Sequence, residues 1–172
     1  MKTAAIIIAL GGALVLQTTL SGLIVGSTVA VNLVLVAIVY LALAYGPVTG
    51  MFAGMVGGLV QDALAGGIVG LGGLTKTVIG FVVGVLSAQF NLTSTVPRLV
   101  IFVVATLVHQ VLLAGLQRIT GSPTMSLQFS RLLVQALINA LVGVIAFFVV
   151  EQGPEVIQRR RMRRTSFAKK RF

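Results

Sequence analysis

The segment from residue 46 to residue 67 reads GPVTGMFAGMVGGLVQDALAGG, and residues 68–84 continue as IVGLGGLTKTVIGFVVG. Both halves are mostly apolar, and small residues recur at every fourth position. The first row consists of Gly46, Gly50, Gly54 and Gly58, and the second of Gly80, Gly84 and Ala88. Because residues four apart share one face of a helix, the segment predicts two helices joined by a glycine-rich turn, each with a stripe of small residues.

The composition indicates that lipid surrounds these helices. Of the 172 residues, 57% are hydrophobic and 9% are charged, and the mean hydropathy is +1.08. A soluble domain carries about 25% charged residues. Eight of the 13 basic residues lie between Arg159 and Arg171, so the rest of the chain is poorer still in charge. These values exclude a soluble enzyme and a disordered tail protein, and the lack of cysteine excludes a disulfide scaffold and thiolate chemistry.

The chain divides into six segments long enough for membrane helices, which need about 20 mostly apolar residues. The segments are 4–21, 29–45, 47–65, 69–90, 97–117 and 127–150. Their apolar runs are continuous, whereas the strands of a membrane barrel alternate apolar and polar residues. The fold class is therefore an all-α integral membrane protein with six transmembrane helices. Residues 1–153 form the transmembrane domain, and residues 154–172 form a basic cytoplasmic tail.

The basic residues also predict the orientation of the chain. Six spans place both termini on one side, and that side then holds Lys2, Arg98 and the eight basic residues of the tail. Arg118 and Arg131 lie toward the other side. Because loops rich in Lys and Arg stay in the cytoplasm, both termini are predicted to be cytoplasmic.

Three polar residues, Gln61, Asp62 and Lys76, lie between the two rows of small residues. A charge at membrane depth costs about 2.5–3.5 kcal/mol on insertion scales and indicates a functional or structural role. Asp62 and Lys76 flank the turn at Gly66-Gly67, so the two side chains are expected to share a depth and to offset each other's desolvation. Two interpretations stay open: an ion pair that clamps the hairpin, or a polar pocket for a ligand or partner.

The same region resembles the rod shape-determining MreD family. The resemblance rests on the Gly-x-x-x-Gly-Leu-x-Gln-Asp core at residues 54–62 and the Gly-Leu-x-x-Leu-x-Lys-Thr-x-x-Gly run at residues 70–80. It implies a non-enzymatic scaffold of the cell-elongation machinery in the bacterial inner membrane. It also implies binding to MreC and support of the peptidoglycan synthases, the glycosyltransferase RodA and a class B penicillin-binding transpeptidase. The small-residue stripes have two interpretations: packing between helices of this chain, or a face that admits a single-span partner such as MreC while the Asp62–Lys76 region stiffens the hairpin.

The family has no established catalytic residues, so the motif positions are candidates for interaction or structure. They are Gly50, Gly54, Gly58, Gln61, Asp62, Lys76, Thr77, Gly80 and Gly84.

A second resemblance supplies an alternative function. Six compact spans with glycine-broken hairpins are similar to the substrate-binding subunits, or S-components, of energy-coupling-factor vitamin transporters. Those subunits contact their energising partner through Ala-x-x-x-Ala on the first helix, and Ala5, Ala9 and Ala13 have this spacing. A vitamin site usually adds aromatic side chains, but this chain has no Trp and its only tyrosines, Tyr40 and Tyr45, lie near one face.

Residues for catalysis or metal binding are scarce. A metal site ordinarily needs three or four ligands, and His109 is the sole histidine. No catalytic, cofactor-binding or metal-binding residue is therefore assigned, and no cofactor is expected. Together with His109, the amides of Gln110, Gln135 and Asn139 are predicted to hydrogen-bond between the fifth and sixth segments, at about 0.6 kcal/mol per bond. A proton relay is the alternative.

The basic tail is predicted to bind anionic lipid headgroups, at about 1 kcal/mol for each basic residue near the surface. Its arginines are Arg159, Arg160, Arg161, Arg163, Arg164 and Arg171. An acidic cytoplasmic partner is the alternative. Nucleic acid is not expected, because no folded reading module accompanies the charge.

Overall fold

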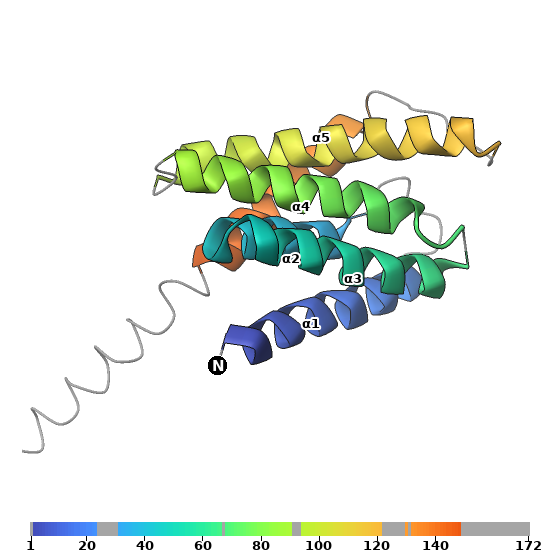
Figure 1. Cartoon of the computed structure of the whole chain (residues 1–172), viewed down its shortest axis with the longest axis horizontal. Coiled ribbons are helices and arrows are strands. Elements are labelled where there is room, and N and C mark those ends of the chain that lie inside the picture. Colours follow the sequence, from blue (N-terminus) through green and yellow to red (C-terminus); the bar gives the residue numbers. More distant parts are fainter. Residues whose placement is uncertain are drawn as a thin grey trace, which may run out of the picture.

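The computed structural model describes residues 2–23, 31–66, 68–90, 94–121, 130 and 132–148, and it is an all-helical bundle (Figure 1). The labelled helices are α1 (Lys2–Leu23), α2 (Leu33–Tyr45), α3 (Pro47–Ala65), α4 (Leu71–Gln89) and α5 (Thr95–Ile119). They are followed by a final helix, Leu132–Phe148. The all-α prediction is confirmed, and the basic tail, with Arg159 to Arg164, lies outside the described residues.

The breaks between helices follow the local sequence. Gly46 adopts φ +90°, and Pro47 occupies the first turn of α3. Glycine enters this region of backbone conformation without a Cβ penalty, and proline at the start of a helix loses no hydrogen bond. At the other end of α3, Gly70 (φ +111°) is the residue from which α4 starts. The predicted breaks at Gly46-Pro47 and at the glycine cluster are therefore confirmed.

Helix α2 is shorter than its predicted segment, which began at residue 29. It has 13 residues and begins at Leu33, because the Asn32 side chain accepts a hydrogen bond from the Leu35 amide and caps the helix. A helix of this length spans about 20 Å, less than the hydrocarbon core of about 30 Å. The helix begins four residues later than predicted, and the capping preference of Asn is the reason.

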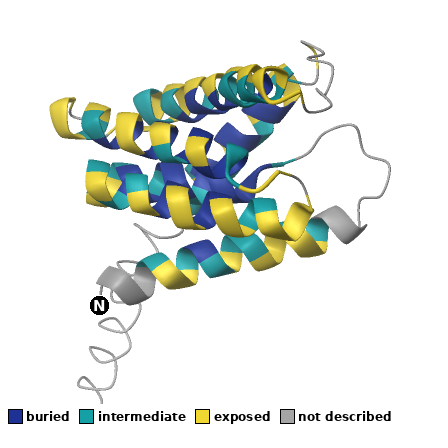
Figure 2. Ribbon diagram, turned by 45° about the vertical axis from the view of Figure 1, so that its right-hand side comes forward, coloured by how far each residue is buried: buried dark blue, intermediate teal, exposed yellow. Residues whose placement is uncertain are grey.

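Helix α2 forms the centre of the bundle. Its sequence, LVLVAIVYLALAY, is hydrophobic on every side, as expected of a buried helix. One core cluster joins it to α4, α5 and the final helix, and a second joins it to α1 and α3. The buried residues accordingly gather in the middle of the molecule (Figure 2).

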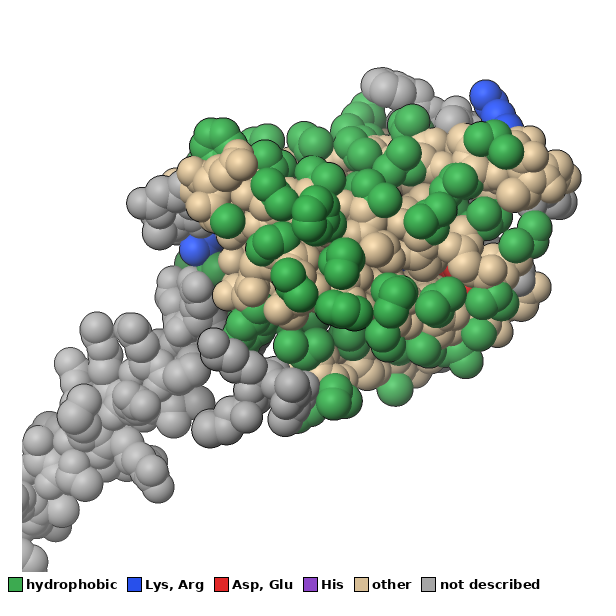
Figure 3. Space-filling view, viewed as in Figure 1, with side chains coloured by type: hydrophobic (Ala, Val, Ile, Leu, Met, Phe, Trp, Pro, Cys, Tyr) green, Lys and Arg blue, Asp and Glu red, His purple; other side chains and the backbone are tan. Residues whose placement is uncertain are grey.

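The outside of the bundle is apolar. Phe52, Phe81 and Val104 are each about half exposed, and hydrophobic side chains cover much of the visible face (Figure 3). Patches of this extent on a folded protein mark a surface that water does not cover. In the described part of the chain, α3, α4 and α5 are long and apolar enough to cross a membrane. These features agree with a helical bundle in a membrane.

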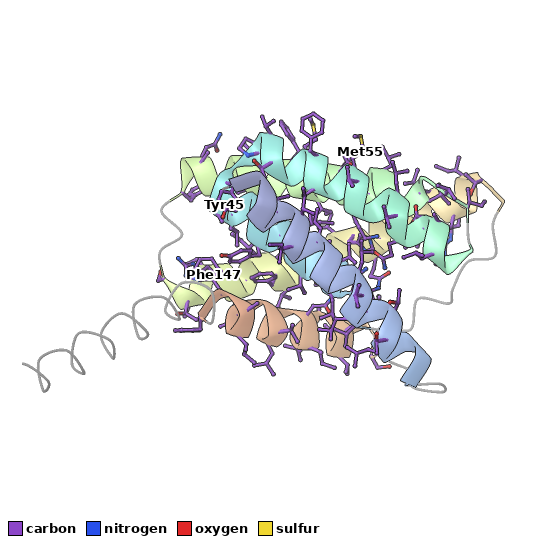
Figure 4. The ribbon with its side chains drawn as sticks, turned by 90° about the horizontal axis from the view of Figure 1, so that it is seen from below. Tyr45, Met55 and Phe147 are labelled. Carbon is purple, nitrogen blue, oxygen red and sulfur yellow. The ribbon has the colours of Figure 1, made fainter. Side chains whose placement is uncertain are left out.

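An aromatic contact fixes the end of the final helix. Phe147 points from that helix toward the interior (Figure 4), where its ring meets Tyr40 of α2 edge to face at 5.4 Å between centroids. The guanidinium carbon of Arg98, near the start of α5, lies 3.5 Å from the centroid of the same ring. The guanidinium of Arg98 thus makes a cation–π contact with the aromatic ring at this end of the bundle.

Candidate functional site

The two rows of small residues meet each other inside the chain. Helices α3 and α4 run antiparallel, so Gly50 lies against Gly80, and Gly58 against Gly73. A Cβ added at Gly58 would lie 2.5 Å from the Cα of Gly73, closer than side chains normally approach. The backbones of α3 and α4 are therefore in direct contact, as expected for small residues in a membrane bundle.

This packing continues along the hairpin. Gly84 faces the backbone of Pro47, and Gly54 faces the backbone of Lys76 and Thr77. Only the ends of the rows are open, because a Cβ at Gly46 would meet nothing within 4 Å and Ala88 is exposed. Helix α4 thus fills the stripe of α3. Of the two interpretations of the stripes, the structure supports packing within the chain and not a face for a partner's helix.

Asp62 caps the start of α4. Its Oδ2 accepts hydrogen bonds from the backbone amides of Gly70 (2.9 Å), Gly72 (2.9 Å) and Gly73 (3.1 Å). The first amides of a helix have no partner within the helix, and Gly70 has no side chain with which to cap α4 itself. A carboxylate also suits the positive end of the helix dipole. Asp62 therefore ties the last turn of α3 to the first turn of α4.

Lys76 is buried beside this cap, with 2% of its surface exposed. Its ammonium donates a 3.5 Å hydrogen bond to the Gly72 carbonyl, so the side chain turns back toward the start of α4. A Cβ at Gly72 would collide with the Asp62 carboxylate and would lie 3.1 Å from Lys76 Nζ. The two charges interact across Gly72, as their predicted common depth requires. The hydrogen-bond partners of the carboxylate, however, are amides and not the ammonium.

The other two polar candidates of this hairpin differ from Asp62. Thr77 Oγ1 donates to the Gly73 carbonyl at 2.7 Å, a bond within its own helix. Gln61 is half-buried, and its Oε1 is buried with no hydrogen-bond partner among residues whose placement the structure gives. Gln61 is thus a neighbour of the cap in sequence and has no role in it.

A second polar group surrounds the start of α2. The Asn32 amide donates to Asn139 Oδ1 of the final helix at 3.1 Å, and the Val34 amide donates to Gln17 Oε1 of α1 at 3.1 Å. With Asn32 capping Leu35, three side chains satisfy three amides at a buried helix start. The sequence analysis missed Gln17 and Asn32. An Asn directly before an apolar run is a recognisable cap signal, but nothing in the sequence identifies Gln17 as its neighbour.

Hydrogen bonds also join α5 to the final helix. Gln110 Nε2 donates to Gln135 Oε1 at 2.7 Å, and Asn139 Nδ2 donates to Thr106 Oγ1 at 3.3 Å. The prediction of hydrogen bonds between the fifth and sixth segments is confirmed for Gln110, Gln135 and Asn139. His109 takes no part, because neither of its buried ring nitrogens has a hydrogen-bond partner among the described residues.

Both polar groups lie toward the same end of the bundle. The start of α2 is level with the last turns of α3, because a Cβ at Gly57 would meet Val34. The turn between α3 and α4 and the end of α5 lie at this end, on the right in Figure 1. The described residues contain no group of three or more His, Asp or Glu side chains placed to hold a metal ion. The arrangement joins helices through caps and through hydrogen bonds of side-chain amides.

The alanine row of α1 is partly enclosed. Ala9 and Ala13 pack against the cluster that joins α1 to α2 and α3. The side chain of Ala5 lies outside the described residues. In this structure the spacing of the alanines serves contacts within the bundle.

A family model described as rod shape-determining protein MreD matches residues 2–152. The match includes all the described helices and the hairpin on which the resemblance was based. No curated protein and no solved structure matches the chain. Because the family model covers most of the sequence, the chain belongs to the MreD family of rod shape-determining proteins.

Proposed function

We propose that the protein is a non-enzymatic scaffold of the bacterial cell-elongation machinery, and that it binds MreC in the inner membrane. Through MreC it would support the peptidoglycan synthases RodA and a class B penicillin-binding transpeptidase. The family match over residues 2–152 carries this proposal. The packing supports a structural role for the polar residues. Asp62 accepts from the start of α4, Asn139 accepts from the backbone amide of Asn32, and the Asn32 side chain caps α2.

A partner's span needs a face that the chain itself leaves open. The glycine stripe of α3 is filled by α4, whereas Phe52, Met55 and Val56 are exposed on α3. We refer to these three residues as the outer face of α3; Met55 projects from it away from the bundle (Figure 4). We therefore propose this face as the contact for the transmembrane helix of MreC.

Bulky substitutions test the contact. Val56 on α3 and Val104 on α5 are each 50% exposed, so Val56→Trp and Val104→Trp are matched variants. We expect Val56→Trp to reduce co-purification of MreC from membranes at least fivefold and Val104→Trp to leave it unchanged. Equal recovery with both variants, at equal amounts of inserted protein, would remove the outer face of α3 as the contact.

We further propose that both termini lie in the cytoplasm and that the basic tail binds anionic lipid headgroups. The chain has no cysteine, so single cysteines at Ser122 and Ser166 report the two sides without background. A membrane-impermeant maleimide applied to intact spheroplasts should label the first and spare the second. The reverse pattern would contradict the proposed orientation.

The alternative is a substrate-binding subunit of a vitamin or micronutrient transporter, with the bundle of an energy-coupling-factor S-component. The buried ring of His109 and the nearby ammonium of Lys76 are polar groups that a ligand site would use. Native mass spectrometry of the purified protein separates the two functions: a bound small molecule retained through purification would favour the transporter. Its absence, together with recovery of MreC, would favour the scaffold.

A further inference from the structure

The contact between α4 and α5 holds two buried polar side chains whose hydrogen bonds are incomplete. Lys76 on α4 is 2% exposed and His109 on α5 is 1% exposed. The ammonium has three donors but makes a single 3.5 Å bond to the Gly72 carbonyl. In the part of the chain that the structure describes, neither ring nitrogen of His109 has a hydrogen-bond partner. Ile79 of α4 and Ala105 of α5 belong to one core cluster. The two helices run antiparallel (Figure 1), and residues three or four apart share a helix face. Lys76 and His109 therefore lie next to each other, one turn beyond this cluster.

The neighbouring protein groups are already engaged. Asp62 Oδ2 accepts from three amides at the start of α4. Thr106, one turn before His109 on α5, donates its hydroxyl to the Phe102 carbonyl at 2.8 Å and accepts from Asn139. These groups therefore leave the imidazole without a protein partner, and a buried polar group without a partner costs about 1–3 kcal/mol.

We propose that an ordered water molecule binds between Lys76 and His109 and bridges α4 to α5. The water accepts a hydrogen bond from Lys76 Nζ and donates one to the unprotonated ring nitrogen of His109. Buried waters typically make about three such bonds to groups that otherwise lack partners.

The charges nearby favour water over an anion. The ammonium of Lys76 already interacts with the Asp62 carboxylate across Gly72. A second negative charge at this depth would lack a counter-charge of its own, and such a charge is costly in a membrane bundle. A neutral molecule that both donates and accepts meets the needs of the site at no net charge. The hairpin and α5 are then joined through a hydrated polar contact.

Nuclear magnetic resonance of the histidine ring tests this site. His109 is the only histidine, so labelling the full chain with ¹⁵N-histidine gives the signals of one imidazole without assignment. The protein is purified with a histidine-free tag and placed in lipid nanodiscs. We expect magnetisation transfer from water to the ring protons that persists when a soluble gadolinium chelate quenches contacts with bulk water.

Two variants link the signal to the bridge. Because Lys76→Met alone leaves Asp62 without its counter-charge, the informative variant is Asp62→Asn with Lys76→Met, which keeps the net charge of the site at zero. It should lose the water signal. The control is Gln110→Leu, next to His109 on α5. It removes the hydrogen bond to Gln135 of the final helix and should retain the water signal.

Three results would overturn the proposal. The first is a folded wild-type protein without protected water transfer. The second, in a sample that also carries ¹⁵N-lysine, is a scalar coupling between Lys76 Nζ and a ring nitrogen of His109, which would show a direct hydrogen bond. The third is a ring signal quenched by the chelate, which would mean an open aqueous pocket. The wild-type measurement stands even where the double variant does not fold.

Discussion

Asp62, in the last turn of α3, accepts a 2.9 Å hydrogen bond from the backbone amide of Gly72, in the first turn of α4. The same oxygen accepts from two more amides, so one carboxylate satisfies most of a helix start across a tight turn. Hydrogen bonds to a charged acceptor are stronger than neutral ones. The cap therefore offsets the cost of placing a carboxylate at membrane depth. From the sequence alone, an ion pair with Lys76 was one of the two interpretations of this carboxylate.

Removal of the cap should destabilise the hairpin. Caps are worth about 0.5–2 kcal/mol, and bonds to charged groups lie at the upper end. We expect Asp62→Ala to lower the free energy of unfolding by about 2–3 kcal/mol in an SDS titration, and Asp62→Asn, which keeps an acceptor, to lower it by about half as much. Leu64→Ala, at a 62% exposed position of the same helix, serves as the control. Equal losses for Asp62→Ala and Leu64→Ala would show that the cap contributes nothing.

The backbone contact of the hairpin predicts opposite outcomes for two Gly→Ala variants. At Gly58 a Cβ would lie 2.5 Å from the Cα of Gly73, so α3 and α4 must separate; at Gly115 on α5 it would meet nothing within 4 Å. Gly58→Ala should cost at least about 2 kcal/mol, comparable to the overpacking of a core. Gly115→Ala should be neutral or stabilise by up to about 1 kcal/mol through helix propensity. Thermal unfolding in detergent distinguishes them, and a Gly58→Ala variant as stable as wild type would contradict the close packing.

The sequence predicted the parts of the fold that depend on local pattern. The hairpin, its two rows of small residues and the break at Gly46-Pro47 follow from spacing and from the conformational properties of glycine and proline, and the structure has them. The start of α2 was placed too early because apolar residues also precede Asn32 in the sequence. The Asn32 side chain, which caps the helix, sets the boundary.

Contacts between distant segments were harder to predict. Gln110 and Gln135 were paired from their place on two adjacent helices, whereas Gln17 meets α2 through the tertiary fold, which spacing does not reveal. The backbone partners of Asp62 were missed for the same reason. Every residue has a backbone amide, so a sequence does not show which amides a carboxylate will meet. The nearest opposite charge, Lys76, was the partner that the sequence could indicate.

Asn139 should be the most sensitive amide of the final helix. It is fully buried and connects the Asn32 amide of α2 to Thr106 of α5. Asn139→Leu leaves the Asn32 amide buried without a partner, which costs about 1–3 kcal/mol. Leu137→Ala, at a 61% exposed position two residues away, should change stability by less than about 0.5 kcal/mol. Hydrogen exchange at the first amides of α2 should accelerate at least tenfold in Asn139→Leu alone; unchanged exchange there would place the amide's partner elsewhere.

Two adjacent phenylalanines at the end of the final helix should respond differently to the same substitution. Phe147 is 7% exposed and contacts both Tyr40 and Arg98, whereas Phe148 is 44% exposed. Phe147→Leu keeps most of the apolar volume but removes the aromatic face, so the edge-to-face pair and the cation–π contact, each worth about 0.5–1.5 kcal/mol, are lost. We expect a loss of about 1–2 kcal/mol for Phe147→Leu and almost none for Phe148→Leu in the SDS titration.

A double-mutant cycle with Tyr40→Leu tests the contact between the two rings. The losses at Tyr40 and Phe147 should be less than additive, because the second substitution removes a contact already lost. Strictly additive losses would mean that the two rings do not stabilise each other.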